Sequence, residues 1–317
     1  MRVGHNPARF VEKVAQPAEI TVAVVNCIPF LSGYYEQSLD VLKACITSIH
    51  ENTPEPHDLM VFDNHSCHEV RAYLENAYEQ GIIQYLVLSD KNIGKIGAWN
   101  FMFGAAQGKY VVFSDGDIGF RPGWLPVTMK IFETFPKVGM VTARPLRTPM
   151  EYSTATLEWA KQLPSGVYEE GHFLDWETYR EHIISLGLTE EQAQADYPGG
   201  TEHRLHYQGQ TAYIGSTHFQ FMAPREVLQK IIPLPSEQPM RGERALDAAI
   251  NKMGLLRLTT DKPLVWHMGN RLSIAVEATV TPKRKSLLHW LLWLPMVRRI
   301  LLWLNNQIFR LYFLNVE

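Results

Sequence analysis

Cysteine is scarce in this sequence, and the three cysteines present form no recognisable set. Cys27, Cys45 and Cys67 are odd in number and lack the spacing of metal ligands. This pattern favours buried thiols in a reducing compartment over a disulfide framework. Residues 1–12 also contain no apolar run of the kind that forms a signal peptide, so we expect a cytoplasmic protein.

A dominant charge of one sign is also missing. The formal net charge is −3 over 317 residues, which gives no overall reason to expect a nucleic-acid partner, and we predict none. No apolar run reaches the roughly 20 residues that cross a bilayer, so no membrane span is expected. The 46% hydrophobic content can bury a large core, in one large domain or two ordinary ones.

What the sequence does contain is a regular alternation of apolar β-favouring segments with segments of helical spacing. Strands are predicted at 20–26, 59–62, 83–88 and 110–113, with helices at 36–51, at 69–80 and up to 106. Such alternation builds βαβ units, so an α/β fold with a mostly parallel central sheet flanked by helices is expected.

The alternation stops at residues 148–209 and then resumes. This stretch predicts only short amphipathic helices, around 157–163 and 176–186, and we interpret it as an insertion over the sheet edge. Beyond it, strands are predicted at 211–214, 217–222, 255–259 and 264–267, with helices from 224 and over 241–253.

Two carboxylates follow the most apolar of these strands. Asp115 and Asp117, separated by Gly116, come directly after residues 110–113, which read as a strand buried on both faces. Ligands of open α/β sheets bind at the carboxyl ends of the strands. Hard oxygen donors there suit Mg²⁺ or Mn²⁺ carrying a diphosphate. The alternative is an ordinary Asp-Gly turn.

A longer motif gives these carboxylates a context. Asn92-x-Gly94-x-x-Gly97-Ala98-x-Asn100 is followed, after one helix, by residues 108–117. With this spacing the chain resembles the GT-A fold glycosyltransferases of family 2, which move a sugar from a nucleotide-diphosphate donor to an acceptor. The resemblance implies a GT-A catalytic domain at 20–270, made of a nucleotide-binding half (20–147), an acceptor-side insertion (148–209) and an acceptor and metal half (210–270). An N-terminal arm (1–19) and a C-terminal tail (271–317) flank it.

The resemblance also implies a donor site. Asp63 takes the place of the acid that accepts a hydrogen bond from the base of the donor, a role that suits a carboxylate facing the imino N–H of uracil. Asn92 and Lys95 would lie under the nucleotide, with Lys95 near phosphate and Asp115 at the diphosphate. The alternatives are a turn or helix cap for Asp63 and a solvated loop tip for Lys95.

A metal site is implied as well. His267 stands where the family places a histidine that completes the site formed by Asp115 and Asp117. An imidazole beside two carboxylates shifts the preference from Mg²⁺ toward Mn²⁺. The alternative is a structural histidine after an apolar strand.

The resemblance also implies a general base. Counting back from Gly254 puts Glu243 at the place of the family's base, while Asp247 lies one helical turn further on, so either could take the acceptor's proton. The usual Glu-Asp pair is replaced here by Gly242 and Glu243. The alternative is an ordinary charged helix start.

These expectations combine into one function. The chain is expected to be a metal-dependent glycosyltransferase of the hexosyltransferase type that moves a single sugar from a UDP- or GDP-sugar to an acceptor hydroxyl with inversion. Retaining transfer on the same fold is one alternative. A catalytically silent module that binds nucleotide sugars is another, because the Glu243 region departs from the family pattern.

Residues 286–314 are mostly apolar. On a helix, five of the polar positions form one narrow cationic stripe, and they are Arg298, Arg299, Asn305, Asn306 and Arg310. Together with Trp290, Trp293 and Trp303, the stripe suits the headgroup layer of an anionic membrane. We therefore expect an amphipathic helical tail at the inner face of a membrane, close to a lipid-linked acceptor. The alternative is a helix pair packed on the domain or in a homo-oligomer.

Overall fold

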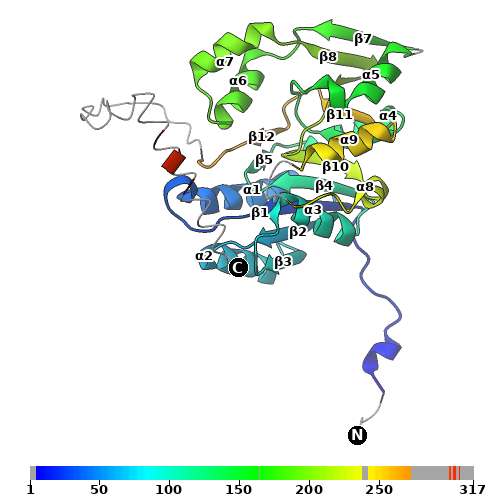
Figure 1. Ribbon diagram of the computed structural model, residues 1–317. Coiled ribbons are helices and arrows are strands. Elements are labelled where there is room, and N and C mark those ends of the chain that lie inside the picture. The colour runs from blue at the N-terminus through cyan, green and yellow to red at the C-terminus, as the bar shows by residue number, and fades with distance from the viewer. Residues whose placement is uncertain are drawn as a thin grey trace. The chain divides into compact units, whose positions relative to one another are not determined.

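The computed structural model describes residues 5–163, 165–237 and 242–272, together with the isolated helical residues 300, 303, 304 and 307. The described fold lies in the unit Met1–Leu272 (Figure 1). The predicted C-terminal amphipathic tail falls almost entirely outside the described residues. Within the part that is described, no helix is both long enough and apolar enough to cross a bilayer.

The elements follow one another along the chain as strands, α-helices and short 3₁₀ turns. The strands are β1 (Ile20–Asn26), β2 (His57–Asn64), β3 (Tyr85–Ser89), β4 (Tyr110–Asp115), β5 (Ile118–Phe120), β6 (Val138–Thr142), β7 (Gly166–Gly171), β8 (Glu202–Tyr207), β9 (Gln210–Ile214), β10 (Gln220–Pro224), β11 (Leu256–Thr260) and β12 (Val265–His267). The α-helices are α1 (Ser38–Asn52), α2 (His68–Glu79), α3 (Gly94–Ala105), α4 (Trp124–Thr134), α5 (Thr154–Lys161), α6 (Trp176–Ser185), α7 (Glu190–Asp196), α8 (Arg225–Ile231) and α9 (Arg244–Lys252). The 3₁₀ turns are Pro7–Phe10, Gly33–Tyr35, Met150–Tyr152 and Tyr197–Gly199.

One large sheet organises this unit. Its strand order in the described residues is β3-β2-β1-β4-β10-β6-β11-β9-β8-β7. Strands β3, β2, β1, β4, β6, β11 and β8 run in one direction, and β10, β9 and β7 run in the other. The predicted α/β fold with a mostly parallel central sheet is therefore confirmed.

Helices cover both faces of the sheet, which explains why its central strands are apolar throughout. In β1, Val22 and Val24 pack into a core shared with α1, α2 and α4, whereas Ala23 and Val25 pack into a core shared with α3, α8 and α9 (Figure 1). A strand buried on both sides has no polar face, so the sequence shows a continuous apolar run instead of an alternating one.

The insertion at 148–209 contains more than the predicted helices. It also supplies β8, which pairs with β9, and β7, which pairs with β8, so that the sheet is extended at one edge. The prediction of short helices alone was therefore incomplete. Strand β7 carries Glu169 and Glu170 and is partly exposed along its length, so it lacks the apolar pattern on which the other strands were recognised.

A buried arginine ties the insertion to the rest of the domain. Arg144, which follows β6, is fully buried and donates to Glu181 Oε2 on α6 at 2.6 Å and to the carbonyl of Val265 at 3.1 Å. Val265 begins β12, so the same guanidinium links α6 to the strand that carries His267.

The cysteines carry no disulfide among the described residues. Cys45 is buried, Cys27 and Cys67 are half-buried, and all three are free thiols. Burial raises the pKa of Cys27 to about 11, so this thiol stays protonated at neutral pH.

Candidate active site

Strand β4 places Asp115 at the carboxyl edge of the sheet, where a cation meets it. Lys95, in the first turn of α3, donates from Nζ to Asp115 Oδ2 at 2.7 Å. The ammonium also lies 5.2 Å from the ring centre of Phe113 and 5.5 Å from that of Trp99. Both side chains of the ion pair are largely shielded, with Lys95 18% and Asp115 25% exposed. Lys95 and Asp115 carry opposite charges, so the pair adds no net charge at this edge of the sheet.

The protonation of Asp115 is set by competing effects. Burial raises the pKa of the Asp115 carboxyl above its ordinary value, the nearby charge of Lys95 lowers it, and the charge of Asp117 raises it again. The net direction is upward. A second carboxylate nearby opposes ionisation of Asp115, and the Lys95 ammonium favours it.

The turn after β4 brings Asp117 against His267. Strand β5 pairs with β12 in antiparallel register, with His267 opposite Ile118, and the Met268 amide donates to the Asp117 carbonyl at 2.8 Å. His267 Nε2 consequently lies 3.3 Å from Asp117 Oδ2. Burial lowers the pKa of His267, but the hydrogen bond and charge of Asp117 outweigh that effect and raise it overall. The two predicted residues are far apart in sequence and adjacent in space.

The donor atoms suit a divalent cation in part. Asp117 Oδ1 and His267 Nδ1 are buried and have no hydrogen-bond partner among the described residues. A buried carboxylate oxygen without a partner is a natural place for a cation. The described residues contain no group of three or more acidic, histidine or cysteine side chains arranged as a metal site. Asp115 is paired with Lys95. Asp117 and His267 therefore offer two protein donors, and the other ligands would have to come from a bound diphosphate or from water.

A second histidine approaches this place from the insertion. The His182 ring on α6 lies 5.5 Å from the Phe219 ring, which in turn lies 6.2 Å from the His267 ring. Burial, together with the charges of Arg144 and His267, lowers the pKa of His182 to about 3, so His182 is neutral at ordinary pH. Through these ring contacts α6 lies near the strand that carries His267.

Asp63 lies at the end of β2, fully buried, and both of its carboxylate oxygens are engaged. Oδ1 accepts from Asn26 at 2.8 Å, and Oδ2 accepts from the Ser66 amide at 3.1 Å and from Arg71 at 3.2 Å. The Ser66 contact is the turn interaction that the sequence offered as the alternative to base recognition. The role of Asp63 toward the base of a donor stays a prediction.

Asn92 shapes the loop that begins α3. Its Oδ1 accepts from Asn64 Nδ2 at 2.9 Å and from the Gly94 amide at 2.8 Å. Gly94 has a φ of 73°, a backbone conformation that other residues rarely adopt. The loop is therefore fixed from the end of β2, and it delivers Lys95 to Asp115.

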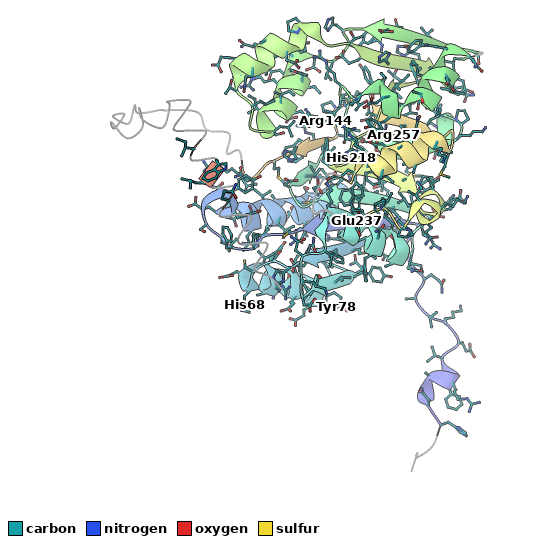
Figure 2. The ribbon with its side chains drawn as sticks, in the orientation of Figure 1. His68, Tyr78, Arg144, His218, Glu237 and Arg257 are labelled. Carbon is teal, nitrogen blue, oxygen red and sulfur yellow. The ribbon has the colours of Figure 1, made fainter. Side chains whose placement is uncertain are left out.

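The two predicted bases on α9 stand in different surroundings. Glu243 is the N-cap residue of the helix and is half-buried. Asp247 is fully buried and is held by three side chains: His218 at 2.6 Å, Arg244 at 3.2 Å and Arg257 through a short contact. Figure 2 labels His218 and Arg257 in this region.

His218 and Arg257 were not singled out from the sequence. Arg257 is 1% exposed and sits inside β11 between apolar residues, so a single arginine in an otherwise apolar strand was the available signal. Such a charge is rarely buried without a partner. His218 lies just before β10 and gave no comparable signal.

Residues 32–187, just under half of the chain, match the model of Glycosyl transferase family 2. This stretch has the sequence pattern of the family 2 glycosyltransferases. The matched residues include β2, α3 and β4, which carry Asp63, Lys95 and Asp115. A search of curated proteins finds no significant match.

The solved structures to which this chain is similar differ widely from it in sequence. GalNAc-T7 with UDP, GalNAc and Mn²⁺ is 14% identical with a TM-score of 0.50, over 78% of this chain and 42% of that one. The mannosyltransferase PcManGT from Pyrobaculum calidifontis, in complex with GDP-Man and Mn²⁺, is 17% identical with a TM-score of 0.45, over 79% of this chain and 59% of that one. S. aureus TarS 1-349 is 12% identical with a TM-score of 0.46, over 77% and 58%. This chain therefore spans about half the length of the solved structures that it matches, and the likeness concerns the fold.

Proposed function

We propose that the protein transfers a single sugar from a nucleoside diphosphate sugar to an acceptor hydroxyl, with inversion at the anomeric carbon. The observation that carries the proposal is the arrangement at the carboxyl edge of β4. There Lys95 pairs with Asp115, and His267 lies beside Asp117, two residues further along the chain. A bound diphosphate needs positive charge and a metal ion at the same place, and this edge supplies an ammonium group together with side chains that can bind a metal.

A divalent cation, Mn²⁺ or Mg²⁺, would be held by Asp117 and His267, with Asp115 next to them. When bound, it would neutralise the negative charge that develops on the leaving diphosphate. Lys95 provides a fixed positive charge beside the same group, and Asp115 holds its ammonium in place. The chain's own residues thus position the leaving group and stabilise its charge.

The acceptor's proton also needs a destination. Glu243 stays in the proposal as a direct base at the start of α9. Asp247 is enclosed by Arg244, Arg257 and His218, so any part it takes has to pass through one of these neighbours.

A silent binding module is the second candidate, and a specific observation favours it. Lys95 already neutralises Asp115, and Arg257 already neutralises Asp247. A site whose acids are paired with the chain's own cations could bind a nucleotide sugar without cleaving it. Binding and nucleotide release must therefore be measured separately.

A thermal-shift screen tests donor binding. The panel is UDP-GlcNAc, UDP-GalNAc, UDP-Gal, GDP-Man and a nucleoside monophosphate control, each with and without Mn²⁺. A donor at 100 times its Kd adds about 2.7 kcal/mol of stability. For a domain of this size that raises Tm by about 5 °C or more. We expect at least one UDP- or GDP-sugar to do so only with Mn²⁺.

The same screen with Asp63→Asn tests base recognition. If Asp63 faces the base of the donor, the variant loses the preference among nucleotides and keeps the response to Mn²⁺. An unchanged preference means that the carboxylate serves only the turn with Ser66. A screen in which no nucleotide sugar shifts the wild-type Tm contradicts the proposed function.

Residues 286–314, which lie outside the described part except at four positions, carry a second proposal based on sequence. Their cationic stripe and tryptophans would bring the domain to an anionic membrane and a lipid-linked acceptor. The full chain should then float with vesicles containing phosphatidylserine at low salt, and a chain ending at Thr281 should not. If the full chain stays unbound and the truncation instead breaks an oligomer, the tail is a packing element.

A further inference from the structure

His218 lies at the same sheet edge as the carboxylates although no sequence motif marks it. The carbonyl of the next residue, Phe219, accepts from the Asp115 amide at 2.8 Å, which fixes this part of the chain beside the end of β4. The His218 ring lies 6.3 Å from the Trp99 ring. Trp99 is also one of the two rings under the Lys95 ammonium. The imidazole and the Lys95 ammonium therefore have Trp99 as a common neighbour.

The hydrogen bond of His218 determines which ring nitrogen can act. Nε2 lies 2.6 Å from Asp247 Oδ2, and because a carboxylate only accepts, Nε2 carries the hydrogen. Nδ1 then has a lone pair, and it makes no hydrogen bond with any of the described residues. The His218 side chain is 18% exposed, whereas Asp247 is completely buried. A molecule arriving from solvent can reach the imidazole and cannot reach the carboxylate.

Arg257 fixes the position of Asp247. Arg257 pairs with Oδ1 of Asp247 and donates in addition to the carbonyls of Tyr152, at 2.7 Å, and Ser216, at 3.0 Å. Ser216 precedes His218 by two residues, so one guanidinium fixes both the carboxylate and the chain that carries the imidazole. A carboxylate behind a histidine orients the ring and stabilises the imidazolium that forms when the ring takes a proton.

The arrangement exceeds what a structural ion pair requires. A buried carboxylate needs one charged partner with additional hydrogen bonds, and Arg257 and Arg244 already supply two. A third partner that is partly exposed, and whose other nitrogen makes no contact with the described residues, adds little to that pair. It adds a base at the edge where the donor would bind.

We propose that His218 is the general base of the transfer, with Asp247 as the residue that positions it; this rests on the proposed function. The acceptor O–H proton moves to Nδ1 of His218 as the acceptor oxygen bonds to the anomeric carbon. The bond from that carbon to the diphosphate oxygen breaks, and its electron pair leaves with the nucleoside diphosphate. The imidazolium then returns the proton to solvent. Glu243 is the competing base.

The test compares His218→Ala, Glu243→Gln and the wild type in nucleoside diphosphate release from the panel of UDP- and GDP-sugars with Mn²⁺, water serving as acceptor. His68→Ala is the matched control, because His68 is exposed on α2 (Figure 2). His218→Ala should lower kcat by about 10²–10⁴-fold. The Mn²⁺-dependent Tm shift with donor should be unchanged, and added imidazole should restore part of the rate in His218→Ala alone.

The possible outcomes separate this inference from the proposed function. If the wild type releases no nucleotide from any donor, the proposed function fails and takes the inference with it. If the wild type turns over and His218→Ala does so equally well, His218 is not the base. A slow His218→Ala that imidazole does not restore, together with a larger loss in Glu243→Gln, assigns the base to Glu243 instead.

Discussion

Replacing Asp117 with asparagine is expected to abolish Mn²⁺-dependent turnover of the donor while leaving the fold intact. The substitution keeps the shape of the side chain and removes its charge. Asp117 Oδ1 is buried without a partner among the described residues, so the change removes the charge that we propose binds the metal and weakens the contact of Asp117 with His267. A metal at a leaving group contributes several kcal/mol to the transition state. Since about 1.4 kcal/mol corresponds to a tenfold change in rate, we expect a loss of about 10²-fold or more.

The control for this variant is Asp40→Asn on α1. Asp40 is 60% exposed and pairs only with Lys43 at the surface, where an ion pair contributes little. Initial rates are measured over a range of Mn²⁺ concentrations for both variants and the wild type. Turnover by Asp117→Asn at the wild-type rate, with the same Mn²⁺ dependence, would show that the metal is held elsewhere or is not needed.

Replacing Arg257 with alanine should produce the largest loss of stability of any single change considered. Arg257 is 1% exposed, and its removal leaves the fully buried Asp247 with His218, which is 18% exposed, and Arg244, which is 48% exposed. Breaking a buried ion pair on one side costs about 3–5 kcal/mol. Burial lowers the pKa of the Arg257 guanidinium, and the charge of Asp247 acts in the opposite direction. The measurement is urea-induced unfolding.

Two comparison variants serve as controls for this experiment. Arg180→Ala removes a 37% exposed arginine that pairs with surface carboxylates, and the expected loss is no more than about 1 kcal/mol. Arg257→Met combined with Asp247→Leu should regain part of the stability, because the unpaired buried charge is gone. A loss below about 1 kcal/mol for Arg257→Ala would mean that Asp247 does not depend on this guanidinium.

The sequence predicted those parts of the site that follow directly from strand ends. Residues 110–113 are uniformly apolar, so a strand between two helical layers was apparent, and Asp115 and Asp117 had to lie at its end. His267 was placed by resemblance, and the pairing of β5 with β12 brings it to Asp117. These are local patterns together with one motif of fixed spacing.

The pairings within the site could not be predicted in the same way. Arg257 meets Asp247, and Lys95 meets Asp115, only because β11 lies under α9 and α3 begins beside β4. Such contacts depend on how elements pack, which residue spacing does not encode. Strands β7 and β8, at the end of the sheet, were missed because their polar residues interrupt the apolar run that marked the central strands.

Release of nucleoside diphosphate tests the central claim most directly. Purified full chain is incubated with the UDP- or GDP-sugar that gives the largest Tm shift, with and without Mn²⁺, and the free nucleotide is measured over time. The site at the end of β4 predicts release that requires the metal and disappears in Asp117→Asn. A donor that binds to the wild type without any release would contradict transfer and leave a binding module. Release that is equal in wild type and Asp117→Asn would place the chemistry away from this edge.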